Sequence, residues 1–267
     1  MVWWLAYVAL GLFTGFFAGM LGIGGGLVMV PALTMMFAAQ PDFPQNEVMH
    51  LALGTSMSVI LFTSLASLLA HHRHGAVLWK VVAQITPGIL LGTLLGTLVA
   101  AGVPSRPLAV FFTCFVCAVA VQMVLDLKPG ATRELPGPPG VFAVGTLNGA
   151  LSSLVAIGGG SLSVPFLVWC NVRVRNAIAT SAAIGFPIAL GGSLGYLFNG
   201  WSHPGLPEWS LGYIHLPAFL WLVPSSMLMA PVGARLAHRL PVATLKRLFA
   251  AVLISLAAKM LWGLSGG

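Results

Sequence analysis

Long apolar stretches, separated by short polar turns, make up almost the whole chain. A helix that crosses the hydrocarbon core of a bilayer needs about 20 apolar residues, and most of these stretches reach that length. The pattern predicts an all-α polytopic membrane protein that has the lipid bilayer as its surroundings and no separate soluble domain. The stretches fall at residues 3–38, 48–70, 77–101, 107–125, 140–171, 176–199, 213–234 and 243–263.

The first and fifth stretches each contain three consecutive glycines, Gly24–Gly26 and Gly158–Gly160. Glycine is unfavourable inside a helix and well suited to a sharp reversal of the chain. Each of these two stretches is also too long for one spanning helix and too short for two. We therefore expect each to fold as a broken or re-entrant helical hairpin, which leaves three transmembrane helices in each half of the chain.

The two halves repeat the same ordered pattern of residues. The segment Ile23–Pro31 returns 134 positions later as Ile157–Pro165, with Ile-Gly-Gly-Gly at the start and Val-Pro at the end of both. An internal repeat of this kind predicts two related structural units: a first membrane repeat at 1–127, a linker at 128–139 and a second membrane repeat at 140–267. Further matches pair Thr55 and Ser56 with Thr180 and Ser181, and Pro87, Gly96, Pro104 and Met123 with Pro224, Gly233, Pro241 and Met260.

Composition agrees with a membrane protein, since 58% of the residues are hydrophobic and only 6% are charged. A soluble domain carries about 25% charged residues. The net charge of +7 would favour a nucleic-acid partner in a soluble protein, but here the basic residues lie in loops, and we expect no such partner. The three cysteines form no disulfide framework, and Cys114 and Cys117 are interpreted as small packing residues inside an apolar helix.

The distribution of basic residues predicts how the chain is oriented. With three spanning helices per half, the second half is inverted relative to the first, and ten Lys and Arg residues share one side while Arg106 and Lys259 lie on the other. The positive-inside rule then puts the ten in the cytoplasm and both termini outside the cell inner membrane. The ten are Arg73, Lys80, Lys128, Arg133, Arg173, Arg175, Arg235, Arg239, Lys246 and Arg247.

The glycine breaks are the predicted substrate site. Helices that restart after a break have unpaired N–H groups in their first turn, and these attract anions through directed hydrogen bonds and the helix dipole. Inverted-repeat transporters place their sites at such broken helices near the middle of the bilayer. The alternative is that the glycines only allow close helix packing. The candidate substrate-binding residues are Gly24, Gly25, Gly26, Thr55, Ser56, Asn148, Gly158, Gly159, Gly160, Ser161, Ser163, Thr180 and Ser181.

Other residues with reactive side chains give weaker indications of function. The histidines at 71, 72 and 74 are interpreted as a solvated loop, so we expect no metal and no cofactor. All five acidic residues fall in predicted loops, which disfavours a membrane carboxylate that carries a proton or sodium. Lys259 is either a counter-charge for the substrate or a side chain that extends to the membrane interface. The sequence Gly191–Gly195 matches GxSxG, but a nucleophile elbow needs a strand before it, so a hydrolase is disfavoured and no catalytic residue is assigned.

The paired glycine segments that end in Val-Pro, with the Thr-Ser pairs that follow them, resemble the sulfite exporter TauE/SafE family. The resemblance covers essentially the whole chain. It implies a transporter of sulfite or of organosulfonates such as sulfoacetate in a prokaryotic inner membrane, and it favours export from the cytoplasm. Ser153 and Ala156 stand where the first half has Gly19 and Gly22, so the halves do not contribute identically to a site. A transporter or channel for another small anion is the alternative, and a homo-oligomer is left open.

Overall fold

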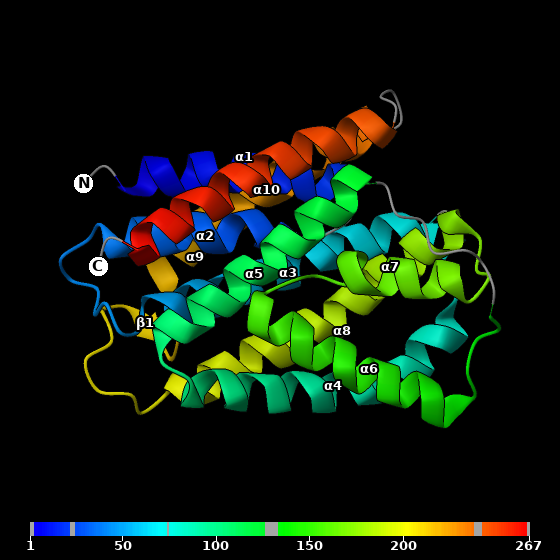
Figure 1. Ribbon diagram of the computed structural model, residues 1–267, viewed down its shortest axis with the longest axis horizontal. Helices are drawn as coiled ribbons and strands as arrows, with labels where there is room; N and C mark the ends of the chain where they lie inside the picture. Colours follow the sequence, from blue (N-terminus) through cyan, green and yellow to red (C-terminus); the bar gives the residue numbers. More distant parts are fainter. Residues whose placement is uncertain (1–2, 22–24, 74, 126–132, 238–241, 266–267) are drawn as a thin grey trace.

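Ten α-helices and one two-stranded β-hairpin make up the described part of the protein in a computed structural model (Figure 1). The structure describes all residues except 1–2, 22–24, 74, 126–132, 238–241 and 266–267. The predicted all-α character is confirmed. In chain order the elements are α1 (Trp3–Leu21), α2 (Gly26–Ala38), α3 (Val48–Arg73), α4 (Trp79–Gly102), α5 (Ser105–Leu125), α6 (Pro138–Val155), α7 (Gly160–Trp169), α8 (Val174–Gly200), β1 (Ser210–Leu211), β2 (Ile214–His215), α9 (Leu216–Ala237) and α10 (Val242–Ser265).

Both glycine-containing stretches are broken, as the sequence predicts. The first consists of α1 and α2, and the fifth consists of α6 and α7. With 13 and 10 residues, α2 and α7 are too short to cross a hydrocarbon core of about 30 Å at about 1.5 Å per residue. Gly25 precedes α2 in the left-handed region with φ of 76°, a conformation that favours glycine. Ala156, at the end of α6, adopts the same region with φ of 44°.

The molecule has two distinct ends. Both chain termini lie at one of them, with the loop 39–47 and the β-hairpin segment 201–215, and this is called the terminal end (Figure 1). The opposite end holds the segments 75–78, 133–137 and 170–173 and is called the basic end. Within the basic end, the Asn176 side chain donates a hydrogen bond to the Ala76 carbonyl, and the Arg133 guanidinium lies over the Trp169 ring.

Glycines bring four helices into close pairs. Helix α1 packs along α9 and α4 packs along α6, while α3 packs against α8 and α5 packs against α10. A Cβ on Gly88 or Gly92 of α4 would come within 2.2 Å of a backbone carbonyl oxygen of α6. Likewise, a Cβ on Gly15 or Gly19 of α1 would come within 2.3 Å of a carbonyl oxygen of α9. For these positions, close helix packing is the reason for glycine.

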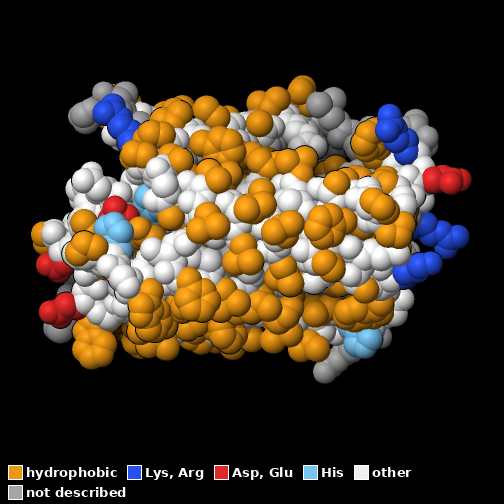
Figure 2. All heavy atoms as spheres, turned by 90° about the horizontal axis from the view of Figure 1, so that it is seen from below, with side chains coloured by type: hydrophobic (Ala, Val, Ile, Leu, Met, Phe, Trp, Pro, Cys, Tyr) orange, Lys and Arg blue, Asp and Glu red, His pale blue; other side chains and the backbone are white. Residues whose placement is uncertain are grey.

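The outer surface suits a bilayer. In the face shown in Figure 2, apolar side chains cover the middle, Lys and Arg gather mainly at one end, and Asp and Glu lie mainly at the other. Exposed leucines, phenylalanines and tryptophans are normal on such a surface, because lipid tails contact them. Six of the described helices are long and apolar enough to cross a membrane, with spans at Trp3–Met20, Val48–Leu69, Trp79–Gly102, Ser105–Leu125, Val174–Gly200 and Leu216–Gly233.

Candidate functional site

The two broken hairpins touch each other inside the bundle. Gly26, the first residue of α2, lies against Ala156, which caps the end of α6. A Cβ on Gly26 would come within 1.7 Å of the Ala156 carbonyl oxygen, so only glycine fits. The second break packs on α8, because the Ser181 hydroxyl donates a 2.7 Å hydrogen bond to the Gly159 carbonyl. The two breaks therefore meet in one buried region, with Ser181 fixed to the second of them.

The start of α2 and the start of α7 supply backbone N–H groups to this region. The carbonyl of Gly25 accepts from the N–H groups of Val28 and Met29, and the carbonyl of Gly159 accepts from that of Ser163. The N–H groups before these have no acceptor within their own helix, as at every helix N-terminus. Gly25, Gly26 and Gly158–Gly160 are all buried, whereas Gly24 lies outside the described residues. Two positive helix ends in a buried region are suited to an anion.

Thr55 and Thr180, two of the candidate substrate-binding residues, contact backbone segments outside the glycine breaks. The Thr55 hydroxyl accepts a 3.0 Å hydrogen bond from the backbone N–H of His215, and the Thr180 hydroxyl accepts one of 3.0 Å from that of Leu78. His215 directly precedes α9 and Leu78 directly precedes α4, so each threonine holds the start of a helix from the other half. The two threonines thus fasten one backbone segment at the terminal end and one at the basic end.

Asn148 and Ser163 form a polar chain that joins α6 to α7. The Asn148 amide nitrogen donates a 2.6 Å hydrogen bond to the Ser163 hydroxyl, and the amide oxygen accepts one of 3.1 Å from Ser152. All three side chains are buried. The chain braces the second break, and the first half has no such amide, because Thr14 stands at the position of Asn148. Sequence reasoning missed Ser152, which its position four residues after Asn148 on one helix face would have indicated.

Two serine hydroxyls in this region have no hydrogen-bond partner among the described residues. They are Ser56 on α3, which is fully buried, and Ser161 in the first turn of α7. Ser56 lies one helical turn before Ile60, whose side chain faces Gly26. An unsatisfied buried hydroxyl destabilises a protein by about 1–3 kcal/mol. These two hydroxyls therefore have all their hydrogen-bonding capacity available to a ligand, whereas the Thr55 and Thr180 hydroxyls already accept one bond each and Ser181 already donates its hydrogen.

The remaining candidates lie away from the breaks. Lys259 is exposed near the end of α10, which fits a side chain that extends to the membrane interface. Ser193 lies inside α8, and its flanking glycines at 191 and 195 pack on Thr93 and Thr97 of α4, so the GxSxG match is a helix-packing pattern. Within the described ranges, no three or more His, Cys, Asp or Glu side chains are grouped to hold a metal ion.

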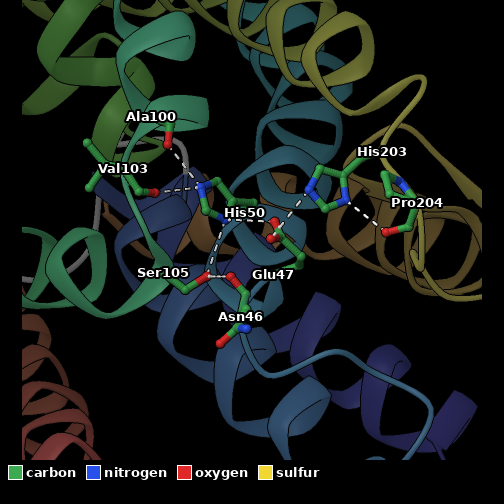
Figure 3. A network of polar contacts seen from close by, with 8 residues as sticks. All are labelled: Asn46, Glu47, His50, Ala100, Val103, Ser105, His203 and Pro204. Atoms are coloured by element: carbon green, nitrogen blue, oxygen red, sulfur yellow. Dashed lines mark hydrogen bonds and ion pairs between the residues drawn. The ribbon is translucent and has the colours of Figure 1, made fainter.

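The acidic residues lie outside the helices, as expected, for the four that the structure describes. They are Asp42, Glu47, Glu134 and Glu208, and Asp126 lies outside the described residues. Glu47 nevertheless turns inward and takes part in a second polar cluster with His50, which sequence reasoning missed (Figure 3). The signal was a carboxylate and a histidine three residues apart at the start of a helix, a spacing that puts both on one face.

Comparison with known proteins decides the class of this architecture. The profile described as sulfite exporter TauE/SafE matches residues 7–260. The chain belongs to the sulfite exporter TauE/SafE family. This TauE/SafE member is similar to a probable membrane transporter protein of Haemophilus influenzae, with 37% identity that covers 96% of this chain and 97% of the relative.

More distant relatives have the same description. The probable membrane transporter protein YunE of Bacillus subtilis is 27% identical, with 96% of each chain covered. A probable membrane transporter protein of Methanocaldococcus jannaschii is 26% identical, with 92% of this chain and 91% of the relative covered. This member of the TauE/SafE family is therefore a multi-pass membrane transporter and not an enzyme.

Proposed function

We propose that this transporter carries small sulfur-containing anions, sulfite or organosulfonates such as sulfoacetate, and exports them from the cytoplasm across the cell inner membrane. The family description as a sulfite exporter supports the substrate class and the direction. The buried, unpartnered hydroxyls of Ser56 and Ser161 carry the proposal of a polar substrate, because nothing among the described residues satisfies them. Neutral donors at helix N-termini suit a substrate with negative charge.

In this proposal the anion is held between the two glycine breaks. The backbone amides of Gly24–Gly26 and Gly158–Gly160 and the hydroxyls of Ser56 and Ser161 donate to its oxygens. Asn148 and Ser163 brace the start of α7, and Ser181 fixes Gly159. Thr55 and Thr180 act at the boundary of the site, where they hold the segments that precede α9 and α4.

These two segments suggest how the substrate enters and leaves. Thr55, Ser56, Thr180 and Ser181 are each at most 1% exposed, so the site region is closed toward both ends. Release of His215 from Thr55 would open the terminal end, and release of Leu78 from Thr180 would open the basic end. Alternating release gives alternating access to one central site.

We infer further that the two halves are inverted repeats. In the repeat, α1 to α5 correspond in order to α6 to α10. Exchange of each helix for its counterpart turns the α1–α9 pair into the α6–α4 pair and leaves the α3–α8 and α5–α10 pairs unchanged, which supports a two-fold relation. His215 follows Leu78 by 137 positions, the spacing that also relates Pro87 to Pro224, so the two threonine contacts are counterparts as well. The positive-inside rule then assigns the basic end to the cytoplasm and both termini to the outside.

Reconstitution into lipid vesicles tests the function. The purified protein is assayed with a panel of labelled anions: sulfite, sulfoacetate, sulfate, chloride and acetate. We expect saturable flux of sulfite or a sulfonate that exceeds the flux of chloride and acetate, with empty vesicles as the control. Equal flux of all anions would instead favour the alternative of a general anion channel. Flux of none of the sulfur anions would overturn the proposal.

A further inference from the structure

A buried histidine at the terminal end is held by hydrogen-bond acceptors on its Nε2 side. His50 lies in the first turn of α3 and is 2% exposed. Its Nε2 atom lies 2.9 Å from the carbonyl oxygen of Ala100 and 3.1 Å from that of Val103, at the C-terminal end of α4 (Figure 3). Carbonyl oxygens only accept hydrogen bonds, so Nε2 carries a hydrogen.

The other ring nitrogen also faces acceptors. His50 Nδ1 lies 3.2 Å from the hydroxyl oxygen of Ser105 and 3.2 Å from Glu47 Oε2. The Ser105 hydroxyl donates its one hydrogen to the carbonyl of Asn46, so it accepts from Nδ1. A histidine that donates from both nitrogens is an imidazolium cation. The surroundings of His50 are thus built for the protonated ring.

Glu47 supplies the counter-charge for this cation. Its Oε2 atom is buried and has no aligned hydrogen-bond donor among the described residues, so the charge of the His50 ring is its compensation. A buried cation without a nearby anion is strongly destabilising. The helix dipoles favour the same charges, because the Glu47 carboxylate lies at the start of α3 and the His50 ring lies at the end of α4.

Other titratable side chains lie around Glu47 and His50, and they are those of His203, Tyr213, Arg106 and His215. The Nδ1 atom of His203 faces the Pro204 carbonyl, and its Nε2 atom lies 3.6 Å from Glu47 Oε1. A proton added to His203 at Nε2 would therefore also face the Glu47 carboxylate. Burial, followed by the charge and hydrogen bond of Glu47, raises the pKa of the Tyr213 phenol, which stays neutral. Arg106, next to Ser105, is exposed. His215 packs against Phe37 and Phe43, and burial lowers its pKa to about 4, so it is neutral near pH 7.

Tyr213 connects this cluster to the boundary of the candidate anion site. Its ring stacks on the His50 ring with centroids 5.1 Å apart. Its carbonyl lies against Gly54, where a Cβ would come within 2.3 Å of the carbonyl oxygen. Two residues later, the His215 N–H donates to Thr55, the neighbour of Ser56. The segment Gly212–His215 therefore lies between the Glu47–His50 pair and the candidate anion site.

We propose that Glu47 and His50 form a proton-binding site, and that the bound proton holds the segment Gly212–His215 closed over the terminal end of the anion site. Loss of the proton leaves the bare Nδ1 lone pair facing the Ser105 oxygen and the Glu47 carboxylate, with no hydrogen between them. The His50 ring is then no longer fixed on its Nδ1 side, and Tyr213, which stacks on this ring, is released. A ligand that binds one state stabilises that state, so protons at the terminal end favour closure. The proposal rests on the proposed function only in that the segment covers the anion site.

The protonation state of His50 is the first test. The full-length protein is labelled with ¹⁵N-histidine in lipid bilayers, and its magnetic resonance spectrum is recorded from about pH 5 to pH 8, the range in which histidine titrates. The signal of His50 is the one missing from the His50→Gln spectrum. We expect an imidazolium signal at low pH that converts to a neutral ring as the pH rises. A neutral His50 throughout the range would overturn the proposal.

Closure of the segment is the second test. In a background without Cys114, Cys117 and Cys170, a Ser56→Cys variant is treated from the terminal end with a membrane-impermeant thiol reagent, and rates are corrected for the thiolate fraction at each pH. We expect labelling at pH 5 to be about tenfold slower than at pH 8, and the difference to vanish with His50→Gln or, independently, with Glu47→Gln. His72→Gln, the same change at the basic end, is the matched control and keeps the difference.

The outcomes separate this proposal from the proposed function. If Glu47→Gln and His50→Gln, each folded, both keep the full pH difference in labelling, the proton-held closure is wrong. If the imidazolium signal and the labelling behave as expected but no anion of the panel is transported, the proton site stands and the proposed substrate falls.

Discussion

The α-carbon of Gly26 packs against the carbonyl oxygen of Ala156, so closely that a Cβ would lie 1.7 Å from that oxygen. The first residue belongs to the helix that restarts after the first glycine break, and the second ends the helix before the other break. This contact joins the two hairpins, and with them the two halves of the chain, at the candidate site. The residues at the break are therefore packing elements as well as part of the candidate site.

Substitution of Gly26 therefore has a structural effect before any effect on substrate. We expect Gly26→Ala to lower the free energy of unfolding by about 1–3 kcal/mol or to prevent folding, because backbone has to move. Thermal unfolding in detergent measures this. Gly102→Ala is the matched control, since a Cβ at Gly102 would meet no atom within 4 Å. Equal stability of both variants would contradict the close contact between the hairpins.

The threonine contacts predict a second pattern in stability. Thr55→Val leaves the buried backbone N–H of His215 without its acceptor, and Thr180→Val does the same to the half-buried N–H of Leu78. We expect each to destabilise the fold by about 1–3 kcal/mol, and Thr→Ser at the same position to retain most of the stability. The measurement is again thermal unfolding. Valine variants as stable as the serine variants would show that the hydroxyls do not hold these segments.

The sequence predicted the helix breaks but not what each polar side chain contacts. Three consecutive glycines disfavour a helix whatever surrounds them, so the positions of the breaks were readable from Gly24–Gly26 and Gly158–Gly160. The partner of Thr55, by contrast, lies 160 residues away and depends on the packing of both halves. The pattern marked Thr55 as a candidate substrate-binding residue, but it did not indicate that the hydroxyl accepts a hydrogen bond from the backbone of His215.

The second polar cluster was missed for the same reason. Glu47 falls in a loop by sequence, and although its spacing of three residues from His50 is a local signal, nothing local indicates that it also contacts His203. The acceptors that surround the His50 ring come from the end of α4 and the start of α5, about 50 residues further along the chain. Such long-range neighbours are set by tertiary packing, which hydrophobic periodicity does not encode.

The orientation of the protein is a third prediction. We expect a single cysteine at position 208 to react with a membrane-impermeant reagent from outside intact cells, and one at position 72 to react only after the membrane is opened. The reason is the excess of Lys and Arg at the basic end. The background lacks the three native cysteines. The reverse labelling pattern would show that the basic end faces outward and would contradict the proposed orientation.

Transport is expected to be electrogenic and to need no other ion, because none of the described acidic residues lies within a spanning helix. An inside-negative potential of 100 mV is worth about 2.3 kcal/mol per charge, which expels a singly charged sulfonate about 50-fold at equilibrium. In vesicles, a potassium-valinomycin potential without a proton or sodium gradient should drive the labelled anion. Flux that ignores the potential and follows a proton gradient would mean obligatory coupling, with Glu47 and His50 as the first groups to examine.

The central claim, an anion site at the two glycine breaks, is tested most directly by the affinity of Ser56→Ala and Ser161→Ala for labelled sulfite. Neither hydroxyl has a partner among the described residues, so the substitutions remove no hydrogen bond from the fold and stability should be retained or raised. A hydrogen bond to a charged group contributes about 1.5–3 kcal/mol, so we predict that each Kd rises at least about tenfold. Ser193→Ala removes another unpartnered buried hydroxyl, on α8, and should bind sulfite as the unchanged protein does. Unchanged affinity in both Ser56→Ala and Ser161→Ala would contradict the account.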